Sequence, residues 1–335
     1  MRLSRRTLVQ ALVGLAAACR LGLVGKALAQ DFTMKLTTSA SNDLDTEWFA
    51  LLKAGVEQAS QGRIRANVFP ASQLGSGPTV IEGVAMGTIE VTMNASGLYE
   101  GLEPRFAVFS VPGVFGSMRQ GAQMLIDADV RQRLATMAHG KGVEVLTALV
   151  VSPAGIVSRR PLAALGDFQG MKIRVPGSVV LSEQLKQLGA APISMALGEA
   201  LPAFQNGTID GVYAATNIFS ALKYYDIAKN LIELPESYLV IVGLANSAFL
   251  QSLGPLEAVV REAAHKADID GAAWGESDVT NARARWHDNG GKIFALAEYD
   301  ARRFLEITVP TALRYLNMDA QADYAVLKQA AARYS

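Results

Sequence analysis

One short motif occurs twice in this chain, and it constrains the fold more than any other feature. A helix-compatible segment runs into Gly87–Glu90 and then into a strand, and a second such segment runs into Gly207–Asp210 and another strand. The copies lie about 120 residues apart, and each follows a strand–helix unit. We interpret the echo as one βαβ-type module in each of two lobes. With 335 residues, of which 50% are hydrophobic, the chain can fill both lobes.

The second module contains an arginine in a position that favours ligand binding. Alternation in Lys172–Val175 predicts a strand, and Pro176 ends it, because proline lacks a backbone N–H and holds the preceding residue extended. Ser178 can start a helix, and Gly189 suits its C-terminal cap. Arg174 therefore lies at the carboxyl end of a strand, beside a helix start. In open α/β sheets that edge is where ligands bind.

The spacing of apolar residues predicts the other elements. Strands are expected at Phe32–Leu36, Ile64–Val68, Ile89–Met93, Val143–Val151, Gly155–Ser158, Ile209–Tyr213, Tyr238–Gly243 and around Ile293. Helices are expected at Leu44–Ala59, Pro78–Met86, Glu199–Asn206, Ala221–Leu231, Ala301–Ile307 and Ala320–Arg333. An irregular segment is expected up to Phe219. Pro310 is expected to separate the last two helices. Leu256–His287 fits one long helix or two helices joined near Gly271 and Gly275. Breaks at Val111–Gly113 and Ser152–Pro153 are natural crossings between lobes.

The first 29 residues predict an export signal. Met1–Arg6 is basic, Leu8–Ala18 is apolar, and Ala27–Ala29 has the small-x-small pattern of a cleavage site. The paired arginines within Ser4–Val9 favour a twin-arginine signal over an ordinary Sec signal, and both lead to the periplasm. The segment holds five of the 31 basic residues and none of the 31 acidic ones, so the rest of the chain carries a net charge of −5. That balance argues against a nucleic-acid binder.

Cysteine usage excludes several classes of site. Cys19 is the only cysteine, so a protein cleaved after Ala29 contains no thiol, no disulfide and no thiolate-metal site. Ala16–Cys19 weakly resembles a lipoprotein cleavage box, which makes lipid anchoring at Cys19 the minority alternative. No other segment offers the roughly 20 uninterrupted apolar residues of a membrane helix. We therefore expect a soluble mature protein in the periplasm.

The sequence also argues against an enzyme. The three histidines, His139, His265 and His287, are scattered without metal-ligand spacing, and no Gly-x-Ser-x-Gly nucleophile motif occurs. Gly75–Gly77 begins like a phosphate-binding loop, but Val80 occupies the place of the third glycine. We expect no catalytic residues, no cofactor and no metal site.

Six short motifs recur in a fixed order along the chain: Phe69–Gly75, Gly87–Glu90, Gly170–Pro176, Gly198–Glu199, Asn206–Gly211 and Lys223–Lys229. Together they resemble the extracytoplasmic solute receptors of the TRAP (tripartite ATP-independent periplasmic) transporters, the DctP-like family. The resemblance covers nearly the whole mature chain. Each piece alone is weak, whereas the ordered set with matching spacing is specific.

The resemblance implies a fold and a domain organisation. The fold is α/β, a two-lobed periplasmic binding protein fold of the type II-like kind, in which each lobe is a mixed sheet flanked by helices and a long helix bridges the lobes. Lobe I is expected to comprise residues 30–151 plus about 240–280, and lobe II residues 152–239 plus about 281–307. Residues 308–335 are expected to form C-terminal helices that pack across the lobes.

The resemblance also implies a function. Receptors of this family close their lobes on an organic acid and present the closed form to the membrane permease subunits, without chemistry on the ligand. The chain is expected to act as a monomer. Two alternatives remain open from the sequence: the binding component of an ATP-driven importer, and a periplasmic ligand sensor. Genomic neighbours encoding two membrane subunits and no ATPase would distinguish the TRAP receptor from the importer component.

By resemblance, Arg174 holds the place of the arginine that clamps the ligand carboxylate. The chemistry agrees, because a guanidinium offers a planar fork of donors that matches a carboxylate bidentately. The residues alone leave a structural alternative, in which Arg174 pairs with Asp167, Glu199 or Asp210 and only ties the strand to the helix.

Departures from the family pattern predict the kind of ligand. Ala154 stands where some members carry a second arginine, Ala214 where many carry an asparagine, and Leu197 where an aromatic ring is common, while Tyr213 adds a ring with one hydroxyl. Each buried ligand oxygen left unpaired costs about 1–3 kcal/mol. The scarcity of polar partners therefore predicts a monocarboxylate with an apolar or aromatic remainder. Further candidate ligand contacts are Asn217, Asn94, Tyr99 and Trp48.

Overall fold

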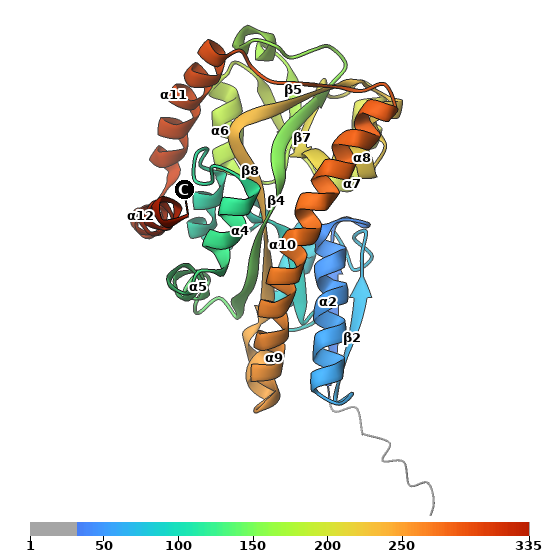
Figure 1. Cartoon of the computed structure of the whole chain (residues 1–335), viewed down its shortest axis with the longest axis vertical. Coiled ribbons are helices and arrows are strands. Elements are labelled where there is room, and N and C mark those ends of the chain that lie inside the picture. Colours follow the sequence, from blue (N-terminus) through green and yellow to red (C-terminus); the bar gives the residue numbers. More distant parts are fainter. Residues whose placement is uncertain (1–31, 335) are drawn as a thin grey trace, which may run out of the picture.

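A single nine-stranded mixed sheet organises the molecule (Figure 1). The computed structural model describes residues 32–334. The strands are β1 Phe32–Thr38, β2 Ile64–Phe69, β3 Val91–Ala95, β4 Val143–Ser158, β5 Lys172–Val175, β6 Ala191–Ser194, β7 Gly211–Ala215, β8 Asn230–Asn246 and β9 Lys292–Phe294. They follow the order β2-β1-β3-β8-β4-β7-β5-β6, with β9 paired to β8. The export signal and the lipidation alternative at Cys19 lie outside the described residues.

Helices cover both faces of this sheet. They are α2 Leu44–Ala59, α3 Gly77–Ala85, α4 Met118–Ile126, α5 Ala128–Ala135, α6 Val179–Gln187, α7 Leu197–Gln205, α8 Thr216–Ala221, α9 Ser247–Ser252, α10 Leu256–Asp288, α11 Glu298–Tyr315 and α12 Met318–Arg333. Short 3-10 turns are η1 Ser96–Tyr99, η2 Pro104–Ser110, η3 Leu165–Phe168 and η4 Tyr224–Asp226. Alternate residues of β4 enter different cores: Leu149 packs with residues of α2 and α10, and Val150 with residues of α4 and α12.

The two long strands β4 and β8 join two half-sheets into one. One half-sheet has β1 parallel to β2 and β3, and the other has β5 parallel to β6 and β7. β4 and β8 pair antiparallel along both halves, with register shifts at three places. The expected α/β fold is thus confirmed, with the refinement that the two expected sheets are continuous. The lobe boundaries given above stay a prediction.

The strand interruption expected at Ser152–Pro153 is absent, because β4 passes through these residues as one strand. The crossing between lobes expected there stays a prediction. Proline is tolerated in a strand at a bulge, where the ladder is already irregular, and a register shift lies at Pro153/Gly155. The polar groups of the bulge find partners on α8. Thr216 donates its backbone N–H to Ser152 Oγ at 2.7 Å and its hydroxyl to the Pro153 carbonyl at 3.0 Å.

The segment after Gly211 also differs from expectation. The strand expected at Ile209–Tyr213 is present as β7, two residues later, and α8 follows it where an irregular stretch to Phe219 was predicted. The helix predicted over Ala221–Leu231 is absent; α8 ends there, and Lys223 has the left-handed φ of 55° before η4 and β8. Apolar spacing alone does not separate a short helix and a strand entry from one helix.

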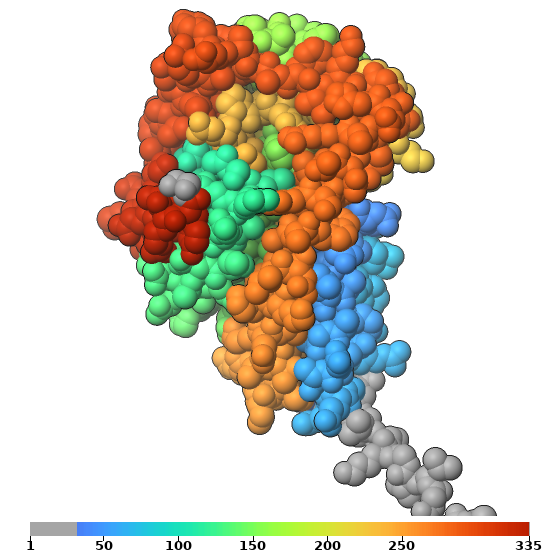
Figure 2. All heavy atoms as spheres, viewed as in Figure 1, coloured from blue at the N-terminus to red at the C-terminus, as the bar shows by residue number. Residues whose placement is uncertain are grey.

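Leu256–Asp288 is one unbroken helix, α10, which resolves the alternative left by the sequence. Its 33 residues span about 50 Å at roughly 1.5 Å per residue. Gly271 and Gly275 do not break it, because both are buried against Leu44 of α2. Figures 1 and 2 show α10 running beside α2 at one end and reaching α8 at the other, so one helix follows the length of the molecule.

The C-terminal helices are divided at a different place from the predicted one. Pro310 lies inside α11 and does not separate two helices. The division comes at Asn317, whose side chain caps α12 by accepting the Ala320 N–H at 2.8 Å. Asn317 therefore marks the helix boundary better than Pro310 does. A helix can keep an internal proline where it packs well, and α11 packs against α6.

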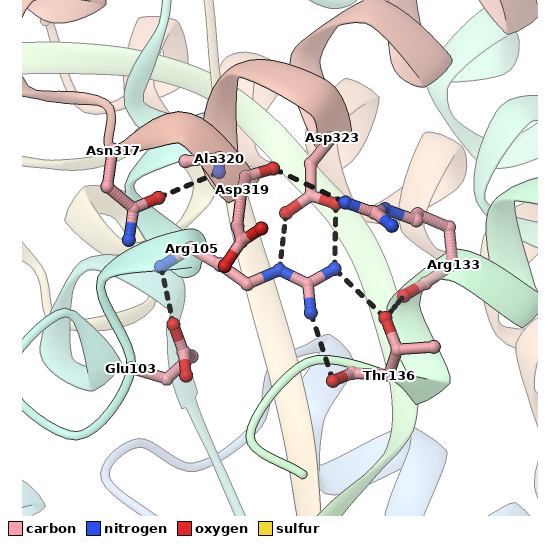
Figure 3. A network of polar contacts seen from close by, with 8 residues as sticks. All are labelled: Glu103, Arg105, Arg133, Thr136, Asn317, Asp319, Ala320 and Asp323. Atoms are coloured by element: carbon pink, nitrogen blue, oxygen red, sulfur yellow. Dashed lines mark hydrogen bonds and ion pairs between the residues drawn. The ribbon is translucent and has the colours of Figure 1, made fainter.

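A buried ion-pair network attaches α12 to the rest of the molecule (Figure 3). Arg105 of η2 donates from Nε and Nη2 to the two carboxylate oxygens of Asp323, both at 2.7 Å. Arg133 of α5 contacts the same carboxylate, and Arg105 Nη1 donates to the Thr136 carbonyl at 3.0 Å. The hydrogen bond to Asp323 raises the pKa of Arg105, so this guanidinium stays charged and has its carboxylate partner within the fold.

Candidate functional site

The local structure around Arg174 is the one predicted. β5 spans Lys172–Val175, and Ser178 caps α6 by accepting the Leu181 N–H at 3.1 Å. Gly189 follows α6 with a φ of 85°, the left-handed conformation that glycine adopts without strain. These elements fix the Arg174 side chain at the carboxyl end of β5.

Arg174 is buried without a carboxylate partner. Its side chain is 5% exposed and donates from Nε to the Met195 carbonyl at 3.0 Å and from Nη1 to the Tyr213 carbonyl at 3.1 Å. Both acceptors are backbone groups, so they orient the guanidinium without neutralising it. Among residues 32–334, Nη2 of Arg174 has no hydrogen-bond acceptor.

The structural alternative for Arg174 does not hold, because each acid proposed as its partner accepts hydrogen bonds elsewhere. Asp167 accepts the N–H groups that precede η3, at 2.8 and 2.9 Å. Glu199 accepts the Ala196 N–H at 3.1 Å, and Asp210 accepts the Lys172 N–H at 2.8 Å. Within the described chain, Arg174 forms an ion pair with none of these three.

The environment of Arg174 disfavours its charge, yet leaves the charge in place at neutral pH. Burial lowers the pKa of Arg174 to about 10, and the Tyr224 and Glu199 side chains offset this only in part. A buried cation whose hydrogen-bond acceptors are only backbone carbonyls is costly, since it has left water without gaining a paired carboxylate. Such a group is poised to receive an anion.

Arg174 lines a cavity of about 350 Å³. The wall is built where strands β1, β3, β5, β6 and β7 end, so the cavity lies at the carboxyl edge of the parallel strands, as expected from the position of Arg174. Its polar lining consists of Arg174, Asp43, Asp45, Glu199 and the serines Ser39, Ser72, Ser76 and Ser194. Its apolar lining includes Leu98, Val151, Met195, Leu197, Ile218, Leu239 and Ile241.

Four of the residues predicted to contact a ligand lie together in this wall: Arg174, Tyr213, Ala214 and Leu197. Tyr213 is buried, and burial raises the pKa of its hydroxyl. Their contact with a ligand stays a prediction.

Five other predicted ligand contacts lie outside the wall. Trp48 is in the core and donates its indole N–H to Asp268 at 2.8 Å, and the Tyr99 hydroxyl donates to the Val242 carbonyl at 2.9 Å. Ala154 is buried in β4, where it pairs with Ala215 of β7. These three have structural roles that explain their positions.

The two asparagines are buried next to the cavity without lining it. Asn217 donates to Asp278 of α10 at 2.7 Å, and Asn94 donates to Thr92 at 3.0 Å. The Oδ1 atoms of both asparagines lack a hydrogen-bond partner among the described residues.

The sequence interpretation missed two acids in the wall. Asp43 is the N-cap of α2, where it accepts the Thr46 N–H at 3.1 Å and the Thr46 hydroxyl at 2.5 Å. Asp45, in the first turn of the same helix, accepts the Thr38 hydroxyl at 2.9 Å. They follow the carboxyl end of β1 as Arg174 ends β5, and the same positional rule could have found them.

Burial raises the pKa of both acids, and that of Asp45 lies well above the usual range of a carboxyl group. The charge of Asp43 adds to the shift of Asp45. The cavity therefore has one unpaired cation and two carboxyl groups whose ionised forms are disfavoured.

No group of three or more His, Cys, Asp or Glu residues within 32–334 is arranged to hold a metal ion. Across the same residues, no helix combines the length and the apolar character that a membrane span requires.

Comparison with known proteins gives the same fold and a family. The family model of the bacterial extracellular solute-binding proteins, family 7 (DctP), matches residues 37–317. The structure superposes on a TRAP periplasmic solute-binding protein of Desulfovibrio salexigens, solved with bound orotic acid, with a TM-score of 0.85 over 90% of this chain and 99% of that one, at 22% identity.

Two relatives in sequence are named as binding proteins. A solute-binding protein of Roseobacter denitrificans is 33% identical over 205 residues, 59% of this chain and 62% of the relative, so the match spans less than two thirds of that protein. The 2,3-diketo-L-gulonate-binding periplasmic protein of Escherichia coli is 27% identical over 256 residues, 76% of each chain.

Proposed function

Since the chain belongs to family 7 of the bacterial extracellular solute-binding proteins, we propose that it captures a small monocarboxylate in the periplasm and delivers it to a TRAP-type membrane permease. The family consists of binding proteins rather than enzymes, and its TRAP receptors bind organic acids. The proposal adds the residue that holds the acid, the type of acid, and the delivery step.

The observation that carries the proposal is the buried, unpaired guanidinium of Arg174 in the cavity wall. Two backbone carbonyls fix its plane, and Nη2 remains without a protein acceptor among the described residues. A carboxylate docked there gains charge-assisted, forked hydrogen bonds in a site from which it displaces water. The ligand carboxylate also gives Arg174 the ion-pair partner that the described residues do not provide.

The rest of the wall favours one carboxylate over two. Asp43 and Asp45 are buried acids, so a second ligand carboxylate reaching them would find no counter-charge and would be repelled by their ionised forms. The apolar lining suits a hydrocarbon or aromatic remainder. Orotic acid, bound by the Desulfovibrio relative, is a planar monocarboxylic acid, whereas the Escherichia coli relative is named for a sugar acid; both compounds belong in a ligand screen.

Closure on the ligand is part of the proposal. Arg174 comes from one half-sheet, and the loop after β1 comes from the other. A ligand that contacts both sides binds the closed arrangement more tightly, and this differential affinity shifts the population toward closure. The permease then recognises the outer surface of the closed receptor, and an ion gradient across the membrane drives transport through the permease.

The two sides already touch beside the cavity. Glu100, next to η1, accepts the Ser178 hydroxyl at 2.6 Å and the Val179 N–H at 2.9 Å, so it holds the N-terminus of α6. Gly97 lies at the contact, where a Cβ would come within 2.7 Å of Ser178 Cβ. Without a side chain at Gly97, η1 can lie directly on the start of α6.

A thermal-shift panel of organic acids tests the proposal, because a ligand at 1,000 times its dissociation constant stabilises the receptor by about 4 kcal/mol. We expect monocarboxylates with apolar or aromatic remainders to raise the melting temperature. A panel in which only sugar acids or dicarboxylates do so would contradict the predicted ligand class.

The role of Arg174 is tested by calorimetry with the best acid from that panel. Arg174→Ala is expected to weaken binding of the acid by at least about 100-fold. Arg174→Lys is expected to recover little of this affinity, because the ammonium group is a point charge without the forked donors of a guanidinium. The matched control is Lys172→Ala, which removes an exposed cation from the same strand. Equal affinities in the Arg174→Ala variant and the wild type would remove Arg174 from the site.

A further inference from the structure

Asp45 is a cavity residue whose burial is only partly explained by its contacts within the fold. Its side chain is 6% exposed, and its one hydrogen-bond partner on another described residue is the Thr38 hydroxyl. None of the cations within residues 32–334 forms an ion pair with it. A carboxyl group removed from water is normally satisfied by several donors or a counter-charge. Asp45 has neither, and it lines the cavity.

Its neighbours show that helix stabilisation does not explain this burial. Asp43 already caps α2, with both its donors supplied by Thr46. Glu47, also in the first turn, can favour the positive end of the helix dipole from a partly exposed position outside the cavity wall. The helix therefore gains little from burying a third acid, and the free capacity of Asp45 faces the space a ligand would fill.

The position of Asp45 complements that of Arg174. Asp45 follows β1 in one half-sheet, Arg174 ends β5 in the other, and both line the same cavity of about 350 Å³. A ligand whose carboxylate meets Arg174 can therefore place its far end near Asp45. At that end a hydrogen-bond donor gains an acceptor, while a bare methyl group leaves the buried carboxyl unsatisfied.

We infer that Asp45 is a specificity-determining residue that accepts a hydrogen bond from a hydroxyl or ammonium group on the ligand, so that the receptor takes monocarboxylates carrying such a donor away from the carboxylate. The inference rests on the proposed function and narrows its ligand class: the remainder is apolar along its length and carries one donor. The raised pKa of Asp45 agrees, since a donor or cation is what the site lacks.

Two matched series of acids test the inference by calorimetry. One is butanoate, 4-hydroxybutanoate, 4-aminobutanoate and succinate; the other is pentanoate, 5-hydroxypentanoate, 5-aminopentanoate and glutarate. In at least one series, the wild-type protein is expected to bind the hydroxy or the amino acid at least tenfold more tightly than the unsubstituted acid, and the dicarboxylate most weakly. The preferred member shows whether the donor is a hydroxyl or an ammonium group.

Variants at Asp45 locate the source of the preference. Asp45→Ala is expected to abolish it, and this variant should bind the unsubstituted acid at least as tightly as the wild type does, because no buried carboxyl group is left unsatisfied. Asp45→Asn keeps an acceptor without the charge, so it should retain binding of the hydroxy acid and lose that of the amino acid. Glu47→Ala, in the same helical turn, is the control and should behave as the wild type. Circular dichroism melting checks that each variant folds.

The outcomes separate the inference from the proposed function. Binding of acids without a donor preference, or an equal preference in wild type and Asp45→Ala, would overturn the inference alone. Failure of every acid of both series and of the organic-acid panel to bind would overturn the proposed function and the inference together.

Discussion

Two buried arginines of this protein differ in one respect, and the difference identifies the site. Arg105 is 8% exposed and Arg174 is 5% exposed. Arg105 makes a forked ion pair with Asp323, which Arg133 joins (Figure 3). Arg174 donates to two backbone carbonyls and to no carboxylate of the described chain.

The electrostatic consequences are opposite. The hydrogen bond to Asp323 raises the pKa of Arg105, whereas burial lowers the pKa of Arg174. A paired buried arginine is complete within the fold and contributes to its structure. An unpaired one in a cavity wall lacks the anion that would complete it, and a ligand carboxylate can be that anion. The exposed fractions of Arg105 and Arg174 are nearly equal, so burial alone does not distinguish the structural arginine from the one in the site.

The largest expected effect is on the paired arginine. Arg105→Met leaves the buried Asp323 carboxylate with Arg133 as its one remaining arginine partner. Breaking a buried ion pair in this way lowers the unfolding free energy by about 3–5 kcal/mol. Urea denaturation would measure it. The double variant Arg105→Met/Asp323→Leu should recover part of the loss, since it removes the stranded charge. A loss below about 1 kcal/mol in the single variant would break the comparison.

A weaker form of this contrast exists between two buried carboxyl groups, because the ion pair of Asp268 with Arg131 is long, at 3.8 Å. Asp323 contacts two arginines, while burial raises the pKa of Asp268 to about 7, with hydrogen bonds from Thr147 and Trp48 and the charge of Arg131 acting against the shift. Because the folded pKa lies above the unfolded value of about 3.9, Asp268 contributes stability that is full below about pH 4 and is lost as the pH rises toward 7.

In Asp268→Asn the unfolding free energy should therefore fall less between pH 4 and 7 than in the wild type. At pH 8 the variant should be more stable than the wild type by about 2–4 kcal/mol, since one pKa unit corresponds to about 1.4 kcal/mol. Asparagine Oδ1 can still accept from Trp48 and Thr147. Melting curves from pH 4 to 8 would check this. Parallel pH profiles of variant and wild type would show that Asp268 is ionised in the folded protein.

A smaller effect is expected at Arg133, the second cation on Asp323. Its side chain is about one-third exposed, so water screens the pair and Arg133→Gln should cost only about 0.5–1 kcal/mol. The comparison is with Arg105→Met in the same denaturation assay. A loss as large as that of Arg105→Met would mean that the network depends on both arginines equally.

The smallest effect on stability is expected at the unpaired arginine. Arg174→Met removes a buried cation and leaves two carbonyls that water in the cavity can reach, so the unfolding free energy of the ligand-free protein should change by less than about 1 kcal/mol. A loss above about 2 kcal/mol in urea denaturation would show that Arg174 holds the fold together as Arg105 does.

Local signals in the sequence were enough for the strand, turn and helix around Arg174. Pro176, Ser178 and Gly189 each determine the backbone within a few residues, so they can be interpreted without tertiary context. Pro153 and Pro310 misled for the complementary reason. The structure keeps β4 and α11 intact through packing and hydrogen bonds from distant residues, such as Thr216, which the local sequence does not reveal.

The site was only partly predictable. Arg174 lies near the end of β5, Tyr213 and Ala214 lie near the end of β7, and Leu197 starts α7. All four line one cavity. Trp48 and Tyr99 could not be told from cavity residues, because an aromatic side chain suits a core as well as a site. Asp45 was missed, since its burial depends on how α2 meets a half-sheet built from distant segments. The Asp323 partner of Arg105 is likewise 218 residues away.

The central claim is that Arg174 is completed by a ligand carboxylate, and a crystal structure with the best acid from the panel tests it most directly. We predict both carboxylate oxygens at about 2.7–2.9 Å from guanidinium nitrogens of Arg174, with the Met195 and Tyr213 carbonyl contacts retained. An acid bound with its carboxylate elsewhere, and Arg174 still contacting only the two carbonyls, would contradict the claim.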